Sequence, residues 1–207
     1  MEKENFVAKK YYAVRKGKKA GIYQSWAECK AMVDGYSGAQ YKSFLTLEEA
    51  KTYIGEASEC KEDPQGAVAY VDGSFNSVTA VYGYGGFVLH DGQKEYLSGS
   101  GADAEMASMR NVAGEVLGSM AAIEKAIELG LPQITIYYDY MGIEMWAKGL
   151  WKRNKKGTIA YYDYVQSVRD QIEIAFCKVK GHSGVEGNEE ADRLAKQAVG
   201  ILEETGQ

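Results

Sequence analysis

Cysteine and histidine are scarce in this chain of 207 residues, and long apolar runs are absent. Three cysteines, Cys29, Cys60 and Cys177, are odd in number and widely spaced. This excludes a disulfide framework and a cysteine-rich zinc site, and it predicts free thiols in a reducing compartment. No apolar run approaches the ~18 residues of a membrane span, so we expect no contact with a membrane. Residues 1–5 lack the apolar core of a signal peptide, which favours a cytoplasmic location.

An excess of positive charge is also missing, because the formal net charge is -5. The average hides an asymmetry. Residues 1–60 hold 10 Lys and Arg against 8 Asp and Glu, whereas residues 61–207 hold 14 against 21. Six basic residues and no acid lie from Lys9 to Lys19. Since the local distribution of charge governs attraction to a polyanion, the N-terminal part remains a candidate for nucleic-acid binding.

The first part of the chain is typical of a small α+β unit. The expected strands are residues 10–14, 21–23 and 41–45, and the expected helices are residues 26–33 and 47–54. Ser25 and Thr46 each precede a helix, and a glutamate follows each of them three residues later, which is the capping-box spacing. We therefore predict a ββαβα domain within residues 1–54. Residues 55–66 show no periodicity and few bulky apolar side chains, which predicts a flexible linker.

Residues 67–207 are predicted to form a larger α/β domain. The expected strands are residues 67–71, 80–90, 93–101, 134–138 and 172–179, and the expected helices are residues 108–129, 142–148, 158–170 and 186–199. Asp91-Gly92 is a hairpin signal between two of these strands. This order indicates a mixed five-stranded sheet with helices on its faces.

Four acids stand where such a sheet would gather them. Asp72 and Asp139 each follow a buried apolar run, Glu115 lies in the long helix, and Asp192 lies in the last helix. If the two strands are parallel neighbours, both aspartates emerge at one sheet edge. Converging carboxylates repel one another unless cations lie among them, and all-oxygen ligation suits Mg²⁺ or Mn²⁺. Two such ions form the usual machinery for phosphodiester displacement.

The pattern alone leaves a simpler interpretation open. Asp72-Gly73 is also a common turn sequence, and most of the 29 acids are expected to be solvated surface residues.

Longer motifs around these acids carry a resemblance. They are Tyr-Val-Asp72-Gly-Ser, Asn111-Val-Ala-Gly-Glu115, Ile-Tyr-Tyr-Asp139 and Lys-Val-Lys-Gly-His182-Ser-Gly-Val-Glu-Gly-Asn188-Glu-Glu-Ala-Asp192. With them, residues 66–199 resemble the type 1 ribonuclease H family. The resemblance implies the ribonuclease H-like fold and an endonuclease that hydrolyses the RNA strand of an RNA–DNA hybrid. It also implies two Mg²⁺ (or Mn²⁺) ions per active site and products with 5′-phosphate and 3′-hydroxyl ends.

The resemblance also assigns roles to single residues. Asp72, Glu115, Asp139 and Asp192 are implied as metal ligands and catalytic residues. His182 is implied to assist proton transfer or product departure, although a lone histidine can also be a simple surface residue. Asn111 is implied to read RNA in the minor groove, and Asn76 and Asn188 are expected as further substrate contacts. Arg110 is a further candidate contact, because its charge could replace a polar contact usual in the family.

The chain departs from the family pattern near two of these positions. Arg110 and Val112 flank Asn111 where members often carry a polar run, so the usual contact with a phosphate of the DNA strand is expected to be altered. Tyr140-Met141 follows the third acid where many members have Ser-Gln. Residues 146–156 hold basic side chains between and after Trp146 and Trp151, which suits either a surface that tracks a nucleic-acid backbone or core aromatics beside a solvated turn.

Residues 10–54 resemble the hybrid-binding domain found ahead of many ribonucleases H and in viroplasmin-like proteins. The matching motifs are Tyr11-Tyr12-Ala-Val-Arg-Lys-Gly, Gly21-Ile-Tyr, Trp26-Ala-Glu-Cys and Ala39-Gln-Tyr41-Lys42-Ser-Phe. The resemblance implies that Trp26 and Tyr41 pack on DNA sugars, with Tyr12 near the same face and Lys42 at a phosphate. Trp26 could instead be a core aromatic, and Ser43 stands where a second lysine is frequent. The expected ligand is an RNA–DNA hybrid, and double-stranded RNA is a second candidate.

Two other functions remain open at this point. One is a non-catalytic protein that binds RNA–DNA hybrids or double-stranded RNA, against which four intact acids count. The other is a DNA strand-transfer enzyme of related fold, which would lack the N-terminal unit and the Gly-His-Ser-Gly loop. No obligate protein partner is expected.

Overall fold

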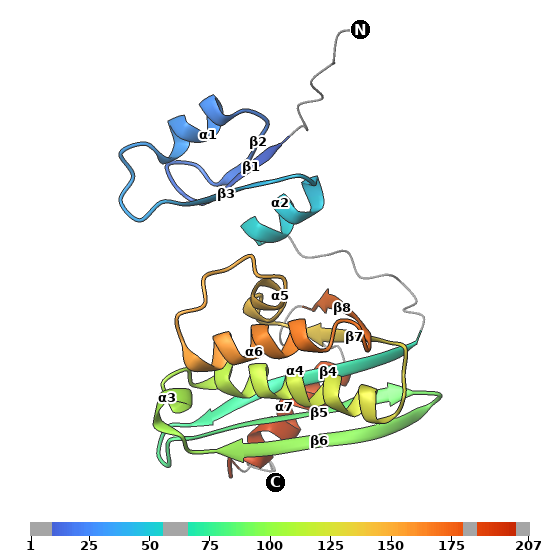
Figure 1. Ribbon diagram of the computed structural model, residues 1–207. Helices are drawn as coiled ribbons and strands as arrows, with labels where there is room; N and C mark the ends of the chain where they lie inside the picture. Colours follow the sequence, from blue (N-terminus) through green and yellow to red (C-terminus); the bar gives the residue numbers. More distant parts are fainter. Residues whose placement is uncertain (1–9, 56–65, 180–185, 202–207) are drawn as a thin grey trace, which may run out of the picture. The chain divides into compact units, whose positions relative to one another are not determined.

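The computed structural model describes residues 10–55, 66–179 and 186–201. The chain divides into two compact units, Met1–Ser58 and Glu59–Gln207, and each is described by itself (Figure 1). The predicted linker falls almost entirely on residues 56–65, which lie outside the described residues. Within the described residues, no helix is both long and apolar enough to cross a membrane.

The N-terminal unit is a three-stranded antiparallel sheet with two helices. Its elements are β1 (Tyr11–Lys16), β2 (Gly21–Tyr23), α1 (Trp26–Val33), β3 (Gln40–Phe44) and α2 (Leu47–Ile54), and the strand order is β2-β1-β3. Val14 packs with Cys29 and Val33 of α1, while Phe44 contacts Tyr53 of α2. The expected ββαβα order is confirmed.

Both predicted caps of this unit are present. The side chain of Ser25 accepts a hydrogen bond from the backbone N–H of Glu28, and the Glu28 carboxylate accepts one from the Ser25 N–H at 3.0 Å. Thr46 accepts from the backbone N–H of Glu49 at 3.2 Å. These short-range bonds satisfy N–H groups that the first turn of a helix leaves unpaired, which is why local sequence located both helices so closely.

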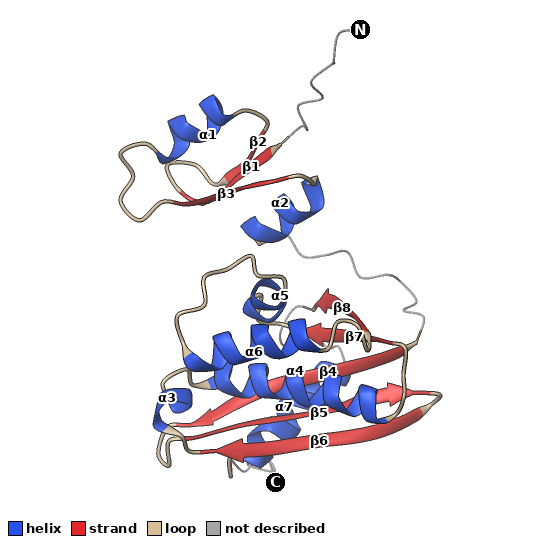
Figure 2. Ribbon diagram, in the orientation of Figure 1, coloured by secondary structure: helices blue, strands red, loops and turns tan. Residues whose placement is uncertain are grey.

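The second unit contains the expected mixed five-stranded sheet. Its elements are β4 (Ala67–Asn76), β5 (Val81–His90), β6 (Gln93–Gly101), α3 (Ala104–Ala107), α4 (Asn111–Glu128), β7 (Gln133–Tyr138), α5 (Gly142–Ala147), α6 (Lys156–Ser167), β8 (Glu173–Lys178) and α7 (Glu186–Ala198). The strand order is β6-β5-β4-β7-β8, with antiparallel pairs on the β6 side of β4 and parallel pairs on the β8 side. Helices α4 and α6 lie on one face of the sheet and α7 on the other (Figures 1 and 2).

Glycines let α4 approach the sheet almost backbone to backbone. A Cβ atom on Gly114 would lie 1.9 Å from the Gly83 carbonyl oxygen, and one on Gly73 would lie 2.2 Å from the Asn111 carbonyl oxygen. Any larger residue at either position would force the helix away from the sheet. The expectation that Asp72 ends its strand is therefore wrong, because Gly73 continues β4 to Asn76 and serves a close approach rather than a turn.

The long helix begins later than its apolar periodicity predicted. The expected start was Ser108, but a short helix, α3, comes first, and α4 starts at Asn111 after a break at Arg110, whose φ is 55°. The apolar stripe that the three- and four-residue spacing predicts on this helix is confirmed, since Val116 and Ile123 are fully buried and Val112, Met120 and Ile127 pack against the core. Similarly, α6 spans Lys156–Ser167 rather than residues 158–170.

A row of aromatic rings crosses four strands on the α7 face of the sheet. Tyr96, Phe87, Tyr70 and Tyr137 occupy paired positions on β6, β5, β4 and β7. Their successive ring centroids lie 6.2, 5.5 and 4.6 Å apart. A Cβ atom on Gly187 of α7 would lie 2.7 Å from the Tyr70 ring, so α7 begins directly on this row.

The cysteines follow the sequence expectation only in part. Cys29 carries a free thiol in the N-terminal core, and burial raises its pKa. Cys177 is disulfide-bonded, so the prediction of free thiols is wrong for this residue. Cys60 lies outside the described residues.

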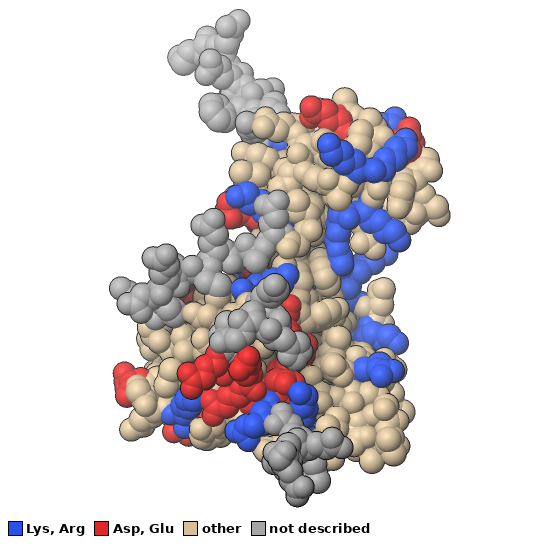
Figure 3. Space-filling view, turned by 180° about the vertical axis from the view of Figure 1, so that it is seen from behind, with Lys and Arg blue, Asp and Glu red and all other residues tan. Residues whose placement is uncertain are grey.

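Charge is also distributed unevenly over the second unit. Helix α7 has a strongly acidic first half with Glu186, Glu189, Glu190 and Asp192. From the side opposite to Figure 1, a patch of Asp and Glu side chains is visible with Lys and Arg side chains near it (Figure 3). A negative field of this kind attracts cations and repels phosphates, so nucleic acid would need positively charged or cation-masked contacts there.

Candidate active site

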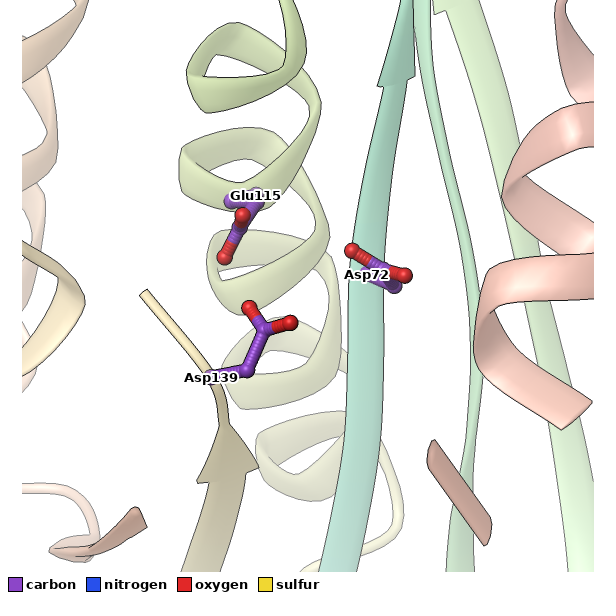
Figure 4. Close-up of side chains that lie close together, drawn as sticks. All are labelled: Asp72, Glu115 and Asp139. Carbon is purple, nitrogen blue, oxygen red and sulfur yellow. The ribbon is translucent and has the colours of Figure 1, made fainter. Parts of the chain in front are cut away.

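Three of the four predicted acids converge. Carboxylate oxygens of Asp72, Glu115 and Asp139 all lie within 4.8 Å of one another (Figure 4). They come from the middle of β4, the second turn of α4 and the residue after β7. The parallel pairing of Tyr70 with Tyr137 explains why Asp72 and Asp139 lie close together, since each aspartate stands two residues beyond one member of that pair.

Burial and repulsion between carboxylates make Asp72 and Glu115 hard to ionise. Glu115 is only 6% exposed, and its Oε2 is buried without a hydrogen-bond partner among the described residues. Burial, then the charges of Asp139 and Asp72, hold the pKa of Glu115 well above its usual range. Burial and the charge of Asp139 raise the pKa of Asp72 to about 7, although the Gly73 N–H, which donates to Asp72 Oδ1 at 2.7 Å, opposes the shift.

This donor set fits a divalent metal. It offers only carboxylate oxygens, and one of them, Glu115 Oε2, is buried and unpaired in the described part of the chain. Hard cations such as Mg²⁺ and Mn²⁺ take oxygen ligands of this kind. A cation among the three groups would relieve both the burial cost and the repulsion that raise the pKa values.

The fourth predicted acid, Asp192, lies nearby but is engaged differently. Its Oδ2 accepts a hydrogen bond from Lys196 Nζ at 2.8 Å, one turn further along α7. The negative charge of Asp192 raises the pKa of Asp72 and the positive charge of Lys196 lowers it, so both side chains act on the cluster. Sequence reasoning missed Lys196, although an acid followed by lysine four residues later on a predicted helix is a recognisable signal.

The residues predicted to contact substrate in this unit are not equally available. Arg110 and Asn111 are exposed at the start of α4, and the Arg110 guanidinium lies 5.2 Å from the Phe75 ring centre. Asn188 is buried in the first turn of α7. His182 lies outside the described residues.

Asn76 has a visible structural task. Its amide nitrogen donates to the Val199 carbonyl oxygen at 3.0 Å, and its Oδ1 accepts from the backbone N–H groups of Val78 and Thr79 at 3.0 and 3.2 Å. These bonds close the turn between β4 and β5 and tie it to the end of α7. A contact between Asn76 and substrate stays a prediction, and this geometry does not favour it.

The tryptophans of the basic segment belong to the core. Trp146 is buried, and its ring meets Trp151 edge-on at a centroid distance of 6.0 Å. The lysines between and after them remain exposed. Of the two interpretations open from sequence, the structure favours core aromatics for the rings.

The N-terminal unit presents an aromatic cluster on its surface. Trp26 and Tyr41 are each 45% exposed, and the Trp26 ring lies 5.9 Å from Tyr12 and 5.8 Å from Tyr41 between centroids. Trp26 is therefore not a core residue. Lys42 lies on the other face of the sheet, 5.6 Å from the ring centre of Phe44. Because β3 is an edge strand, Lys42 nevertheless stands at the border of the sheet.

Comparison with protein families and known proteins agrees with this geometry. Residues 64–200 match the RNase H family, and residues 10–54 match the family described as the ribonuclease H1 N-terminal domain. Ribonuclease H1 of Mus musculus is 26% identical over 252 aligned residues, covering 90% of this chain and 88% of the mouse protein.

Two solved structures show the same fold. RNase H1 of Halobacterium salinarum superposes with a TM-score of 0.54 at 21% identity, covering 66% of this chain and 98% of that one. LC11-RNase H1 in complex with an RNA/DNA hybrid gives 0.53 at 15% identity, covering 65% and 96%. The chain therefore belongs to the ribonuclease H family of RNA hydrolases, and it carries a ribonuclease H1 N-terminal domain ahead of the RNase H unit.

Proposed function

We propose that this protein is an endonuclease that hydrolyses the RNA strand of RNA–DNA hybrids with two Mg²⁺ or Mn²⁺ ions, leaving 5′-phosphate and 3′-hydroxyl ends. One observation carries the proposal above all. Carboxylate oxygens from three separate elements lie within 4.8 Å of one another, and the chain belongs to a family of RNA hydrolases. A structural neighbour, LC11-RNase H1, is known in complex with an RNA/DNA hybrid, which supports the substrate class.

The residues take the following parts in this proposal. Asp72, Glu115 and Asp139 would hold the metal, and Asp192 of α7, which accepts a bond from Lys196 in the structure, would contribute as a further ligand. The ions, when bound, lower the pKa of the attacking water and neutralise charge on the leaving oxygen. Binding of cations displaces the protons that the raised pKa values of Asp72 and Glu115 would otherwise retain.

Other side chains position the substrate. Arg110, just before α4, and Asn111, its first residue, stand exposed five and four residues before Glu115, where a charge and an amide can contact a phosphate and a 2′-hydroxyl. His182 is proposed to move a proton or help the product leave, and Asn188 to support the start of α7.

The N-terminal unit is proposed to hold the hybrid near the active site. The exposed rings of Trp26 and Tyr41, with the partly buried Tyr12 beside Trp26, offer a platform for sugars, and Lys42 at the edge strand can reach a phosphate. Contacts to sugar and phosphate predict little sequence preference and strong salt dependence. A tethered module of this kind raises the local concentration of substrate. Double-stranded RNA is a second proposed ligand of this unit.

The deciding experiment is cleavage of an end-labelled RNA–DNA hybrid with Mg²⁺ and with Mn²⁺. Wild type should cut the RNA strand only, and Asp139→Asn should not. Single strands and an RNA duplex serve as controls. Extension of the cut RNA by a polymerase would demonstrate 3′-hydroxyl ends. Tight hybrid binding without cleavage under either metal would instead establish the non-catalytic alternative.

A further inference from the structure

A carboxyl side chain is fully buried five residues after Asp139 in the chain. Glu144 of α5 is 0% exposed, yet it keeps two strong partners. The Tyr138 hydroxyl donates to Glu144 Oε2 at 2.5 Å, and Lys148 Nζ donates to Glu144 Oε1 at 2.5 Å. Tyr138 is itself fully buried and is the residue immediately before Asp139.

These bonds close a short loop around Asp139. Tyr138 ends β7 and Glu144 lies in α5, so their hydrogen bond spans only six residues with Asp139 inside the span. The loop has little freedom elsewhere, since a Cβ atom on Gly142 would lie 2.3 Å from the Tyr140 ring and 2.7 Å from the Trp146 ring. The backbone that presents Asp139 is therefore held on both sides.

Packing alone does not require a charge here. Burying the Glu144 carboxylate costs solvation energy that its attraction to a partner often fails to return, and an apolar side chain of similar volume commonly gives equal stability. A hydrogen-bonded pair fixes the orientation of the two groups that it joins, whereas an apolar pair does not. Here the segment between the two groups is the loop that carries Asp139, whose orientation decides where the Asp139 carboxylate lies.

We propose that Tyr138 and Glu144 are positioning residues that hold the Asp139 carboxylate at metal-binding distance from Asp72 and Glu115. This inference rests on the proposed function, because it assigns these residues to the same metal site. They touch neither metal nor substrate. Their effect is on how tightly the cluster binds a divalent cation.

The test measures cation binding apart from cleavage. Binding of Mn²⁺ to the full-length protein is followed by the loss of the free-ion electron paramagnetic resonance signal, for wild type, Tyr138→Phe and Glu144→Gln. Replacing a side chain that orients a metal ligand typically weakens metal binding by about 10- to 100-fold. We expect weakening of about tenfold for Tyr138→Phe. The half-saturating Mg²⁺ concentration for hybrid cleavage should rise in step, while kcat at saturating Mg²⁺ and KM for the hybrid should change little.

A matched control separates positioning from loss of stability. Val88→Ala also removes fully buried atoms, but from β5, away from the Asp139 loop. It should lower Tm at least as much as Tyr138→Phe and leave Mn²⁺ affinity unchanged. If Tyr138→Phe fails to fold, Lys148→Met removes the outer, 44% exposed partner of Glu144 and should weaken Mn²⁺ binding about threefold, less than an inner variant.

The outcomes distinguish this inference from the proposed function. Folded Tyr138→Phe and Glu144→Gln proteins that bind Mn²⁺ as wild type does would overturn the positioning role, as would an equal loss of affinity in Val88→Ala. If wild type binds Mn²⁺ through Asp139 but cleaves no hybrid, the proposed function fails, and the binding comparison still decides the positioning role.

Discussion

Replacing Asp72 with asparagine should stabilise the protein when metal is absent. The side chain keeps its shape, and its Oδ1 can still accept the Gly73 N–H bond that is 2.7 Å long in the structure. What disappears is a carboxylate that must ionise beside Asp139 in a buried site. Because the pKa of Asp72 is raised, the folded state holds the proton more tightly than the unfolded state, and folding stability falls as pH rises.

The size of the effect follows from the shift. The pKa of Asp72 rises from 3.8 to about 7, and one pKa unit corresponds to about 1.4 kcal/mol. Ionising Asp72 in the folded protein above pH 7 therefore costs about 4 kcal/mol at most. Because Asp72 titrates together with its acidic neighbours, only part of that cost is removed by changing Asp72 alone. We therefore expect Asp72→Asn to raise the free energy of unfolding by about 2 kcal/mol, or Tm by about 4 to 8 °C.

The assay is thermal denaturation of the full chain in a metal chelator, followed by circular dichroism. The advantage of Asp72→Asn should be full at about pH 8, shrink as pH falls below the folded pKa of about 7, and vanish near the unfolded value of 3.8. Added Mg²⁺ should stabilise wild type more than the variant, because bound cations remove the repulsion. Asp170→Asn, at an exposed position, is the control and should change little.

One result would refute this reasoning. If Asp72→Asn were no more stable than wild type at about pH 8 without metal, the carboxylates would not be in conflict, and the electrostatic case for a cation among them would fall.

Three further substitutions test other parts of the structure. Gly114→Ala would put a Cβ 1.9 Å from the Gly83 carbonyl oxygen, and it should lower the free energy of unfolding, measured by chemical denaturation, by about 3 kcal/mol or more. The control Gly130→Ala, in open space at a φ of +67°, should lower it by about 1 kcal/mol. Equal losses of stability in the two variants would contradict the close approach of α4. Thr46→Ala should lower the stability of the N-terminal unit by about 1 kcal/mol through loss of the cap, which thermal melting of that transition would measure. Trp26→Ala should raise KM for the hybrid about tenfold, while kcat and the salt dependence of binding should change little. A fall in kcat alone would count against a binding role for Trp26.

Local features of this fold were predictable because their causes are local. Ser25 and Thr46 cap helices through bonds that span three residues, and Asp91-Gly92 turns the chain with positive φ values of 48° and 76°. The apolar stripe of α4 likewise follows from helical periodicity alone. Such signals need no knowledge of what packs across the sheet.

Features that depend on distant partners were missed. Asp72-Gly73 reads equally well as a turn, and only the backbone of α4 lying against Gly73 shows why the glycine is there. The start of α4 shifted because Arg110 takes a positive φ that no short-range signal announces. Convergence of the acids depends on the parallel register of β4 and β7, and in the sequence alone it had to be taken from family resemblance. The bond between Tyr138 and Glu144 had no sequence signal that we recognised.

The aromatic row on the α7 face also provides an optical gauge of the proposed metal site. Closely spaced rings of fixed orientation give strong near-ultraviolet circular dichroism, and Tyr70 and Tyr137, the most closely stacked pair in the row at 4.6 Å, each stand two residues before an aspartate of that proposed site. None of the three tryptophans belongs to this row, since Trp26 lies in the other unit, Trp146 lies in α5 and Trp151 packs against Trp146. The tyrosine bands should therefore report cation binding in the unlabelled protein, separately from the proposed hybrid binding at Trp26, which is expected to change tryptophan fluorescence.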